Sequence, residues 1–456
     1  MLQEKSKARL SLVSAIAALF SGVLPASSLA AKELDSIVVT ATRQATRSNE
    51  LLADVSVISR EEIEAAGQSS LVELLARQPG VEYARRGGPG TVSTVFIRGM
   101  NSAHTLVLID GVRSGSVSFG TTAFSLLPLN QIDHIEILRG PASALYGADA
   151  MGGVIQIFTR NGEGPARFNA SLGVGSHNVS DEVSAGVSGG TAAVSYSLQA
   201  GYSTSQGFSA INNQASALFE RDHDEYRNQN VSASFALRPA SGHELGLKIL
   251  NSDGISAYDS LPTVDASTRQ SISNYTAYSR NQLSERWVST LQAGRSIDSY
   301  TGRSSGISQP GSVSRTDQNQ FSWQHDIQLP LGRALLATEL LQQELSVTTA
   351  FTVKERTIRS WLGGWSGALG LHQLQWNVRH DDNSQFGSKN TGVAAYGYQF
   401  APQWRAHISA GTAFKAPTFY DLYYPGSSTP NLKPERAKNT ELGLNWERGL
   451  AQQGSE

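Results

Sequence analysis

Beyond about residue 164, segment after segment of the chain alternates apolar and polar side chains, and this period of two constrains the fold more than any other feature. It recurs over residues 231–237, 374–378 and 404–410. It is most regular where apolar or aromatic residues fill every second position, at Val194, Tyr196, Leu198, Ala200 and Tyr202. Because successive side chains of a strand point to opposite faces, each segment is predicted to be a β-strand with one apolar face.

Strands of this kind suit two architectures, a soluble β-sandwich or a barrel whose apolar face meets lipid. Apolar outer faces with Trp and Tyr near the strand ends favour the barrel. No run of about 18 apolar residues follows the first 30 residues, so a helical membrane protein is excluded. At roughly 9 to 11 residues per spanning strand, the chain after Gly164 supplies about 12 to 16 strands.

Residues 1–30 have the layout of a secretion signal. Three basic residues precede an uncharged stretch over residues 10–24, and small residues follow up to Ala30. The uncharged stretch is too short to span a bilayer. We therefore expect export, with cleavage to a mature chain that begins near Ala31. A buried helix or a membrane anchor is the alternative.

The composition excludes several classes of function. The 456 residues include no cysteine, so the exported chain has no disulfide framework and no thiol chemistry. A net charge of -2 provides no basic surface for nucleic acid. No His, Ser or paired carboxylates recur at an enzyme-like spacing, so we predict no catalytic residues and no enzymatic activity.

Residues 51–162 have the pattern of a compact α+β domain. Capping boxes are predicted at Ser59 with Glu62 and at Ser70 with Glu73, each before a short helix. Strands are predicted over residues 55–58, 92–97, 105–109, 132–138 and 154–159.

A polar stretch, residues 31–50, lies between the signal and this domain. We interpret it as a flexible tether that pairs as a strand with the sheet edge of a partner, where backbone hydrogen bonds provide affinity. Taken alone, the same string also fits an ordinary edge strand. The residues predicted to pair, called here the coupling segment, are Asp35, Ser36, Ile37, Val38, Val39, Thr40 and Ala41.

Several strings resemble the plug domain of TonB-dependent outer-membrane receptors. They are residues 71–81, 95–101, 106–113, 135–141 and 144–147. Strings at 380–387, 414–417 and 430–435 look similar to the cobalamin receptors within that family. The fold that the resemblance implies is mainly β, with an N-terminal α+β plug domain (51–162) inside an antiparallel transmembrane β-barrel (163–456). In the family such barrels have about 22 strands.

The resemblance also implies a location and partners. It places the chain in the outer membrane of a Gram-negative cell, among lipid and lipopolysaccharide, as a monomer. The coupling segment becomes a TonB box, which pairs with the periplasmic domain of TonB and receives energy for active import. The implied ligand is cobalamin or another large chelate.

Two arginines in the plug strings need partners if they are buried. We expect Arg98 and Arg139 to pair with Asp110, Glu136 or carboxylates of the barrel wall.

The contact positions of cobalamin receptors, carried onto this chain by resemblance, fall in two loops. The glycine frame at residues 87–90 matches, but several side chains depart from those expected of a cobalamin receptor. An aromatic ring at Phe119 fits either stacking on a flat macrocycle or packing on the barrel wall. The predicted ligand residues are Arg86, Thr91, Val92, Ser93, Phe119 and Gly120.

Acidic residues further along resemble the calcium-binding outer loops of cobalamin receptors. Carboxylates from neighbouring loops supply the oxygen ligands that calcium prefers, but a solvated loop is the alternative. Ser209 stands where another carboxylate is expected, and we expect His223 to face solvent. No other cofactor is predicted. The predicted metal ligands are Glu220, Asp222, Asp224 and Asp253.

Alternative functions stay open. One is a receptor for a ferric siderophore or haem, although no histidine lies between Lys415 and Asn431, where haem receptors usually have one. Another is a binding module or a truncated chain without transport activity. The final residues, 450–456, lack the terminal aromatic strand that outer-membrane barrels generally have, so the sequence predicts a C-terminally truncated barrel.

Overall fold

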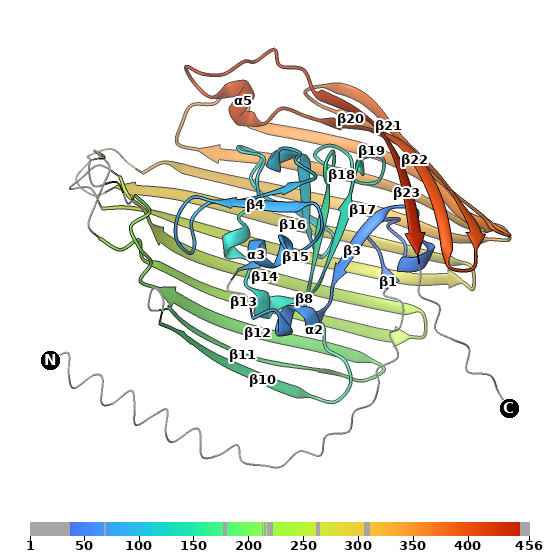
Figure 1. Cartoon of the computed structure of the whole chain (residues 1–456), viewed down its shortest axis with the longest axis horizontal. Helices are drawn as coiled ribbons and strands as arrows, with labels where there is room; N and C mark the ends of the chain where they lie inside the picture. Colours follow the sequence, from blue (N-terminus) through green and yellow to red (C-terminus); the bar gives the residue numbers. More distant parts are fainter. Residues whose placement is uncertain are drawn as a thin grey trace. The chain divides into compact units, whose positions relative to one another are not determined.

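The computed structural model describes residues 37–67, 70–176, 180–211, 213, 216, 222–260, 265–304 and 311–446. In these residues the chain forms a large antiparallel sheet and a smaller mixed domain that lies against its inner face (Figure 1). No helix in this part of the chain is long and apolar enough to cross a bilayer.

The large sheet contains 14 strands in sequence order, each paired antiparallel with its neighbours along the chain. This number falls within the range predicted from the alternating segments. The strands are β10 (Arg167–Gly175), β11 (Ser180–Gly190), β12 (Val194–Ser205), β13 (Tyr226–Ala240), β14 (His243–Ala257), β15 (Ala266–Ser284), β16 (Trp287–Ser304), β17 (Val313–Leu329), β18 (Gly332–Val347), β19 (Glu355–Leu369), β20 (His372–Asn383), β21 (Gly387–Ala401), β22 (Trp404–Lys415) and β23 (Glu435–Trp446).

The connections between these strands alternate in length, which distinguishes the two ends of the sheet. At one end, here the short-turn end, the connections at 241–242, 285–286 and 402–403 have two residues each. At the other, the long-loop end, β12 and β13 are joined through residues 206–225, and β22 and β23 through 416–434. The second of these connections contains the helix α5 (Phe419–Tyr423).

The two faces of the sheet differ as the period of two predicts. On β12, Leu198 is 50% exposed, whereas its neighbours Ser197 and Gln199 are 4% and 2% exposed. The outer face is therefore apolar and the inner face polar, the pattern of a strand that meets lipid on one side. All seven tryptophans lie on strands of this sheet, and six of them are exposed: Trp287, Trp323, Trp361, Trp376, Trp404 and Trp446.

The inner domain is built on a five-stranded sheet, in the order β3-β8-β9-β6-β7, and a separate hairpin of β4 and β5. The strands are β3 (Asp54–Ile58), β4 (Val81–Arg85), β5 (Ser93–Ile97), β6 (Thr105–Ile109), β7 (Val112–Ser114), β8 (Ile132–Arg139) and β9 (Gly153–Thr159), so all five predicted strands are present. The helices are α2 (Arg60–Ala65), α3 (Leu71–Leu75) and α4 (Ser143–Tyr146), with 3-10 turns η2 (Ser48–Glu50), η3 (Ser102–His104), η4 (Phe124–Leu126) and η5 (Leu129–Gln131).

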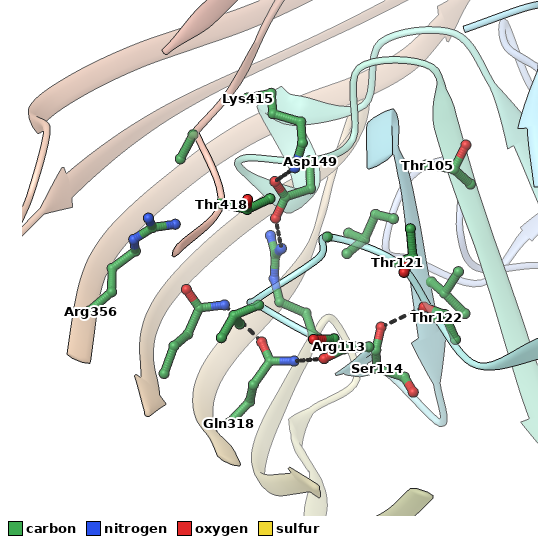
Figure 2. Close-up of a pocket in the computed structure, with 18 residues that line it drawn as sticks. Thr105, Arg113, Ser114, Thr121, Thr122, Asp149, Gln318, Arg356, Lys415 and Thr418 are labelled. Atoms are coloured by element: carbon green, nitrogen blue, oxygen red, sulfur yellow. Dashed lines mark hydrogen bonds and ion pairs between the residues drawn. The ribbon is translucent and has the colours of Figure 1, made fainter. Parts of the chain in front are cut away.

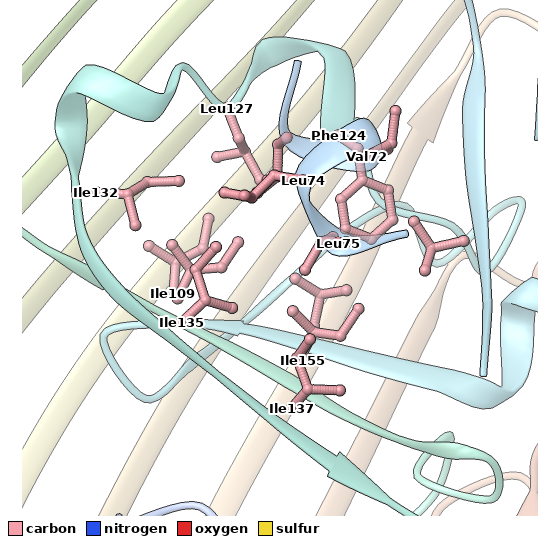
Figure 3. Close-up of a cluster of buried hydrophobic side chains, with 14 of the residues drawn as sticks. Val72, Leu74, Leu75, Ile109, Phe124, Leu127, Ile132, Ile135, Ile137 and Ile155 are labelled. Carbon is pink, nitrogen blue, oxygen red and sulfur yellow. The ribbon is translucent and has the colours of Figure 1, made fainter. Parts of the chain in front are cut away.

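Apolar side chains from α3, η4 and the five-stranded sheet form the core of this domain (Figure 3). Leu75, Ile135 and Ile155 are each fully buried there. Leu250 and Ile272, which belong to β14 and β15, join the same cluster. The inner domain therefore shares its core with the wall of the large sheet.

One of the two predicted capping boxes forms. The Ser59 side chain accepts from the Glu62 backbone, and the Glu62 carboxylate accepts from the Ser59 N–H at 2.8 Å. The prediction at Ser70 is wrong, because its hydroxyl makes no capping bond within the described residues. Glu73 instead pairs with Arg85 at 3.2 Å, a contact that the local sequence does not indicate.

The two plug arginines meet a partner that the sequence analysis missed. Arg98 and the buried Arg139 both pair with Asp54, at 2.8 and 3.1 Å. Arg98 also pairs with Glu441 of β23, which agrees with the predicted barrel carboxylate.

The other two carboxylates proposed for these arginines were wrong assignments. Asp110 pairs with Lys248 of β14 at 2.8 Å. Glu136 points to the coupling segment, described below.

Candidate functional site

The coupling segment is docked into the inner domain from Ile37 onward. Its strand β1 (Ile37–Val38) pairs antiparallel with β2 (Thr46–Arg47). Val38 and Thr40 are completely buried, and Ala41 is nearly so. Asp35 and Ser36, also predicted for this segment, lie outside the described residues.

Glu136 of β8 holds the backbone of the docked segment. Its carboxylate accepts from the Val39 N–H at 3.0 Å and from the Thr40 N–H at 2.7 Å. Hydrogen bonds to charged groups are typically stronger than those between neutral groups. The Tyr146 hydroxyl donates to the Thr40 carbonyl at 2.9 Å, and the Thr40 hydroxyl lies 3.1 Å from the Gln156 side-chain oxygen.

Residues 38–41 of the predicted tether are thus packed against the inner domain in this structure. A stretch with few large side chains still orders here because buried polar groups satisfy its backbone, and an unpaired N–H in that position would cost free energy. The ability of the segment to pair with a partner stays a prediction.

A charged histidine lies beside this carboxylate. The His134 ring is within 2.8 Å of the Asp133 carboxylate and 3.7 Å of that of Glu136. Burial lowers the pKa of His134, but hydrogen bonds to Asp133 and Glu136 outweigh it and raise the pKa to about 9. His134 therefore adds positive charge next to Glu136 at neutral pH.

The first predicted ligand loop reaches the long-loop end of the sheet. A Cβ placed on Gly88 would lie 3.6 Å from the Phe208 ring, so this loop is in contact with the β12–β13 connection. Gly90 has a φ of +81°, and a Cβ there would overlap the ring of Tyr226. Glycine is therefore required at residue 90 by both conformation and space.

The side chains predicted to contact a ligand in this loop divide into two groups. Arg86 and Val92 are exposed, Val92 by 52%. Thr91 and Ser93 are buried, and their hydroxyls donate to the carbonyls of Gly88 and Thr91 at 2.8 and 3.2 Å. The two hydroxyl residues thus shape the loop, whereas the side chains of Arg86 and Val92 are exposed.

The second predicted loop presents an aromatic ring. Phe119 is 48% exposed, and its ring centroid lies 5.6 Å from that of Tyr420 in α5. Tyr420 stacks in turn on Tyr424 at 4.4 Å. Phe119 therefore packs against a loop of the wall and still exposes half of its surface. Gly120 is next to it, with a φ of +70° and close to Thr418.

The sequence analysis missed α5 and its tyrosines. A detectable sign was present, because Thr418 and Asp421 form a capping box in which the Asp421 carboxylate accepts from the Thr418 N–H at 2.9 Å. What the sequence does not indicate is that this helix stands over the Phe119 loop.

Three carboxylates meet near the first loop. Oxygens of Asp222, Asp224 and Asp259 lie within 4.8 Å of one another, with Asp224 buried and Asp222 exposed. Asp259 was not predicted. It follows β14, and the pairing of β13 with β14 brings it close to the other two.

The remaining predicted metal ligands do not join this group in the described structure. Asp253 lies within β14 and pairs with Arg269 at 2.9 Å. Glu220 lies outside the described residues. His223 is exposed, as predicted.

Comparison with known families identifies this arrangement. Residues 47–154 match the model described as TonB-dependent Receptor Plug Domain. Residues 181–452 match the model described as TonB dependent receptor-like, beta-barrel, which covers more than half of the chain. The chain belongs to the TonB-dependent receptors.

Curated relatives of this TonB-dependent receptor include transporters of vitamin B12. It is 34% identical over 441 residues to the vitamin B12 transporter BtuB of Photobacterium profundum, covering 92% of this chain and 69% of the relative. It is 30% identical to BtuB of Vibrio vulnificus, covering 94% of this chain and 70% of the relative. The predicted family, plug and barrel are thereby confirmed.

Solved structures with the same fold include proteins whose names give ligands other than vitamin B12. The siderophore receptor PirA from Acinetobacter baumannii superposes with a TM-score of 0.73 at 20% identity, over 86% of this chain and 68% of the other. The copper transporter OprC superposes with a TM-score of 0.71 at 15% identity, over 87% and 71%. At such identities the likeness shows the fold alone. As a TonB-dependent receptor of the outer membrane, the protein is a transporter and not an enzyme.

Proposed function

We propose that this TonB-dependent receptor binds cobalamin at its long-loop end and imports it across the outer membrane. The observation that carries the proposal is the 34% identity, over 92% of the chain, to a vitamin B12 transporter. It is supported by exposed loop side chains at that end, Arg86, Val92 and Phe119. Phe119 and Tyr420 provide aromatic surface on which a large planar ligand can stack.

The buried coupling segment supports an energy-dependent mechanism. In this proposal, Val39 and Thr40 leave Glu136, residues 35–41 add a strand to the periplasmic domain of TonB, and a pull on them rearranges the plug. The docked backbone bonds of Val39 and Thr40 are those that must break first.

Calcium is proposed as a structural ion of the outer loops. Asp222, Asp224 and Asp259 supply up to three carboxylate ligands, and backbone carbonyls or water supply the rest of the 6 to 8 oxygens that calcium takes. In this proposal the ion ties the β12–β13 connection to the β14–β15 connection beside the first ligand loop.

The cellular setting is part of the proposal. We propose that residues 1–30 are cleaved on export, and that the receptor works as a monomer surrounded by lipid and lipopolysaccharide. The exposed apolar faces of the strands support a lipid environment.

The direct test is ligand binding to outer membranes that contain the full chain. Cyanocobalamin, haem and ferric enterobactin are titrated separately, with and without a calcium chelator. The proposal expects saturable binding of cyanocobalamin alone, weakened when calcium is removed. If ferric enterobactin or haem binds and cyanocobalamin does not, the assignment of cobalamin as the substrate is wrong.

Substitutions locate the site. Phe119→Ala is expected to weaken cyanocobalamin binding by about tenfold, since an aromatic contact contributes roughly 0.5–1.5 kcal/mol beyond its buried area. Leu371→Ala, an exposed apolar residue at the short-turn end, serves as the matched control and is expected to leave binding unchanged. Equal loss in both variants would argue against a site at Phe119.

A further inference from the structure

Two cationic side chains pair with one carboxylate below the second ligand loop, and a third lines the same cavity. Lys415 Nζ lies 2.8 Å from Asp149 Oδ1, and Arg113 Nη1 lies 3.2 Å from Asp149 Oδ2. Figure 2 shows Lys415 and Arg113 reaching Asp149 from two sides, with Arg356 on the strand wall nearby. Lys415 and Arg356 are each only 6% exposed.

The third cation has no acidic partner of its own among the described residues. Arg356 donates from Nε to the Gln385 side-chain oxygen and from Nη2 to the Pro417 carbonyl, both at 2.8 Å, and its guanidinium faces the Phe419 ring at 4.8 Å. Within the described part of the chain, Asp149 is the one carboxylate within 4 Å of any nitrogen of the three cations.

The nearest other acids are already matched. Two arginines and two carboxylates form a neighbouring group whose charges balance one another: Arg43, Arg379, Glu339 and Asp381. Asp421 is exposed and caps α5. The cluster of Arg113, Arg356, Lys415 and Asp149 therefore carries about two positive charges that no nearby acid of the described chain balances.

Titration does not remove this charge. Burial raises the pKa of Asp149, but Lys415 and Arg113 more than offset it and hold the pKa below its usual range. Asp149 is thus already ionised, and its single negative charge balances only one of the three cations. Burial also lowers the pKa of Arg113, which is the expected cost of holding a cation away from water.

A small polar cavity lies among these side chains. Its volume is about 60 Å³, and Arg113, Arg356 and Lys415 all line it. Asp149 also lines it, together with apolar side chains such as Val107 and polar ones such as Gln318. The Thr105 hydroxyl, another lining group, makes no hydrogen bond within the described structure. Since a cavity of about 10–15 Å³ on this measure holds one water molecule, this cavity has room for several waters or one small anion.

We propose that this cavity binds a small anion. Buried cations need a compensating charge, and a cavity lined by three cations, one carboxylate and the Thr105 hydroxyl has an excess of positive charge that an anion compensates and water does not. The anion is either a free halide from solution or an anionic group, such as a phosphate, of the transported ligand that enters beneath Phe119. The halide case does not depend on the identity of the ligand.

The test uses bromide, which is visible by anomalous diffraction. Crystals of the full chain are soaked in sodium bromide, and the melting temperature of the detergent-solubilised protein is followed against bromide concentration at constant ionic strength, with gluconate as the replacement anion. An anomalous peak between Arg113, Arg356 and Lys415, together with saturable stabilisation, is the expected result. No peak and no stabilisation by bromide over gluconate, with no group of cyanocobalamin in the cavity, would overturn the proposal.

Variants at Arg356 separate charge from folding. Arg356→Gln retains an N–H donor for the Gln385 side-chain oxygen but removes one charge, and it is expected to weaken bromide binding by at least about tenfold. Arg356→Lys retains the charge and is expected to restore most of the affinity. Arg167→Gln, on the exposed strand β10, is the matched control and is expected to bind bromide as the unaltered chain does.

A second soak identifies the source of the anion. Crystals that hold bromide are exposed to cyanocobalamin, which carries a phosphate diester. Loss of the bromide peak with ligand density in the cavity assigns the site to the ligand's anionic group. A peak that persists assigns it to a resident halide.

Discussion

The carboxylate of Glu136 accepts a 2.7 Å hydrogen bond from the backbone N–H of Thr40, although 96 residues separate the two in sequence. A strand that joins the sheet of a partner needs its backbone donors for that partner. As long as Glu136 holds them, the coupling segment is occupied within its own molecule. In the proposed mechanism, release from Glu136 therefore precedes the pairing of this segment with TonB.

Replacing Glu136 by Gln is expected to loosen the segment. The neutral amide removes a charged acceptor, and the loss of about 1 kcal/mol corresponds to roughly fivefold more of the released state. Because the chain has no cysteine, a single Val39→Cys substitution gives a unique thiol whose maleimide labelling rate reports release. The rate is expected to rise about fivefold in Glu136→Gln.

The matched control for this experiment is Glu82→Gln, on the exposed face of β4. It is expected to leave the labelling rate unchanged. A rate that is the same in all three proteins would show that Glu136 does not hold the segment.

The stability of the plug is expected to fall at alkaline pH through His134. Its pKa in the folded protein, about 9, lies above the ordinary value of 6.5. The protonated form is thus favoured by folding, and its contribution is complete below about pH 6.5 and is lost as the pH rises through about 9. The melting temperature is expected to decrease between pH 7 and 10 more in the unaltered protein than in His134→Gln, in curves recorded as a function of pH.

Two outcomes decide this prediction. His372→Gln, at the exposed short-turn end, is expected to keep the alkaline loss. If His134→Gln loses stability as steeply as the unaltered protein, the titrating group lies elsewhere.

Gly90→Ala is expected to displace the first ligand loop. The new methyl group overlaps the Tyr226 ring, and the positive φ adds about 1–2 kcal/mol of backbone strain. Cyanocobalamin affinity is expected to fall by more than about tenfold, measured by equilibrium binding. Removing the ring in Gly90→Ala/Tyr226→Ala is expected to recover part of the affinity by relieving the overlap.

Gly370→Ala tests backbone strain alone. Gly370 also has a positive φ, but a methyl group added there would meet no heavy atom of the described chain within 4 Å. The substitution is expected to lower stability slightly and to leave binding intact. A similar loss of binding in both variants would mean that the effect is global.

Calcium dependence is expected to follow Asp259 and not Asp253. Asp224→Asn and Asp259→Asn each remove a charged ligand from the three-carboxylate group and are expected to abolish the rise in melting temperature that calcium produces. Asp253→Asn, which breaks only the pair with Arg269, is expected to retain that rise. Calcium titrations of the three variants distinguish these results. A calcium effect that Asp253→Asn removes and Asp259→Asn retains would contradict the structural assignment.

Local pattern was enough to predict much of the fold. The strand over residues 105–109 was found because five consecutive apolar or β-branched residues indicate a buried strand, and its pairing with β9 confirms it. The capping box at Ser59 could be predicted because both of its hydrogen bonds join residues three apart in sequence. Ser70 fits the same pattern, but Arg85 competes for Glu73, and such a contact depends on the tertiary fold.

The site was predicted less completely for the same reason. Asp259 is 35 residues from Asp224 in sequence, and only the pairing of two long strands brings them together. The Phe119–Tyr420 contact joins residues about 300 apart. Motifs indicate which loops belong to the site. The residues that contact these loops, such as Tyr420, depend on how the plug sits against the wall.

The distribution of tryptophan has a practical consequence. All seven tryptophans lie on the strands of the wall, and the inner domain has none. Tryptophan fluorescence of this receptor therefore comes from the wall alone, and the inner domain contributes no tryptophan emission of its own. Replacing Phe119 by Trp would place the one emitting indole of the plug at the outward loop, so that plug movement can be recorded in real time.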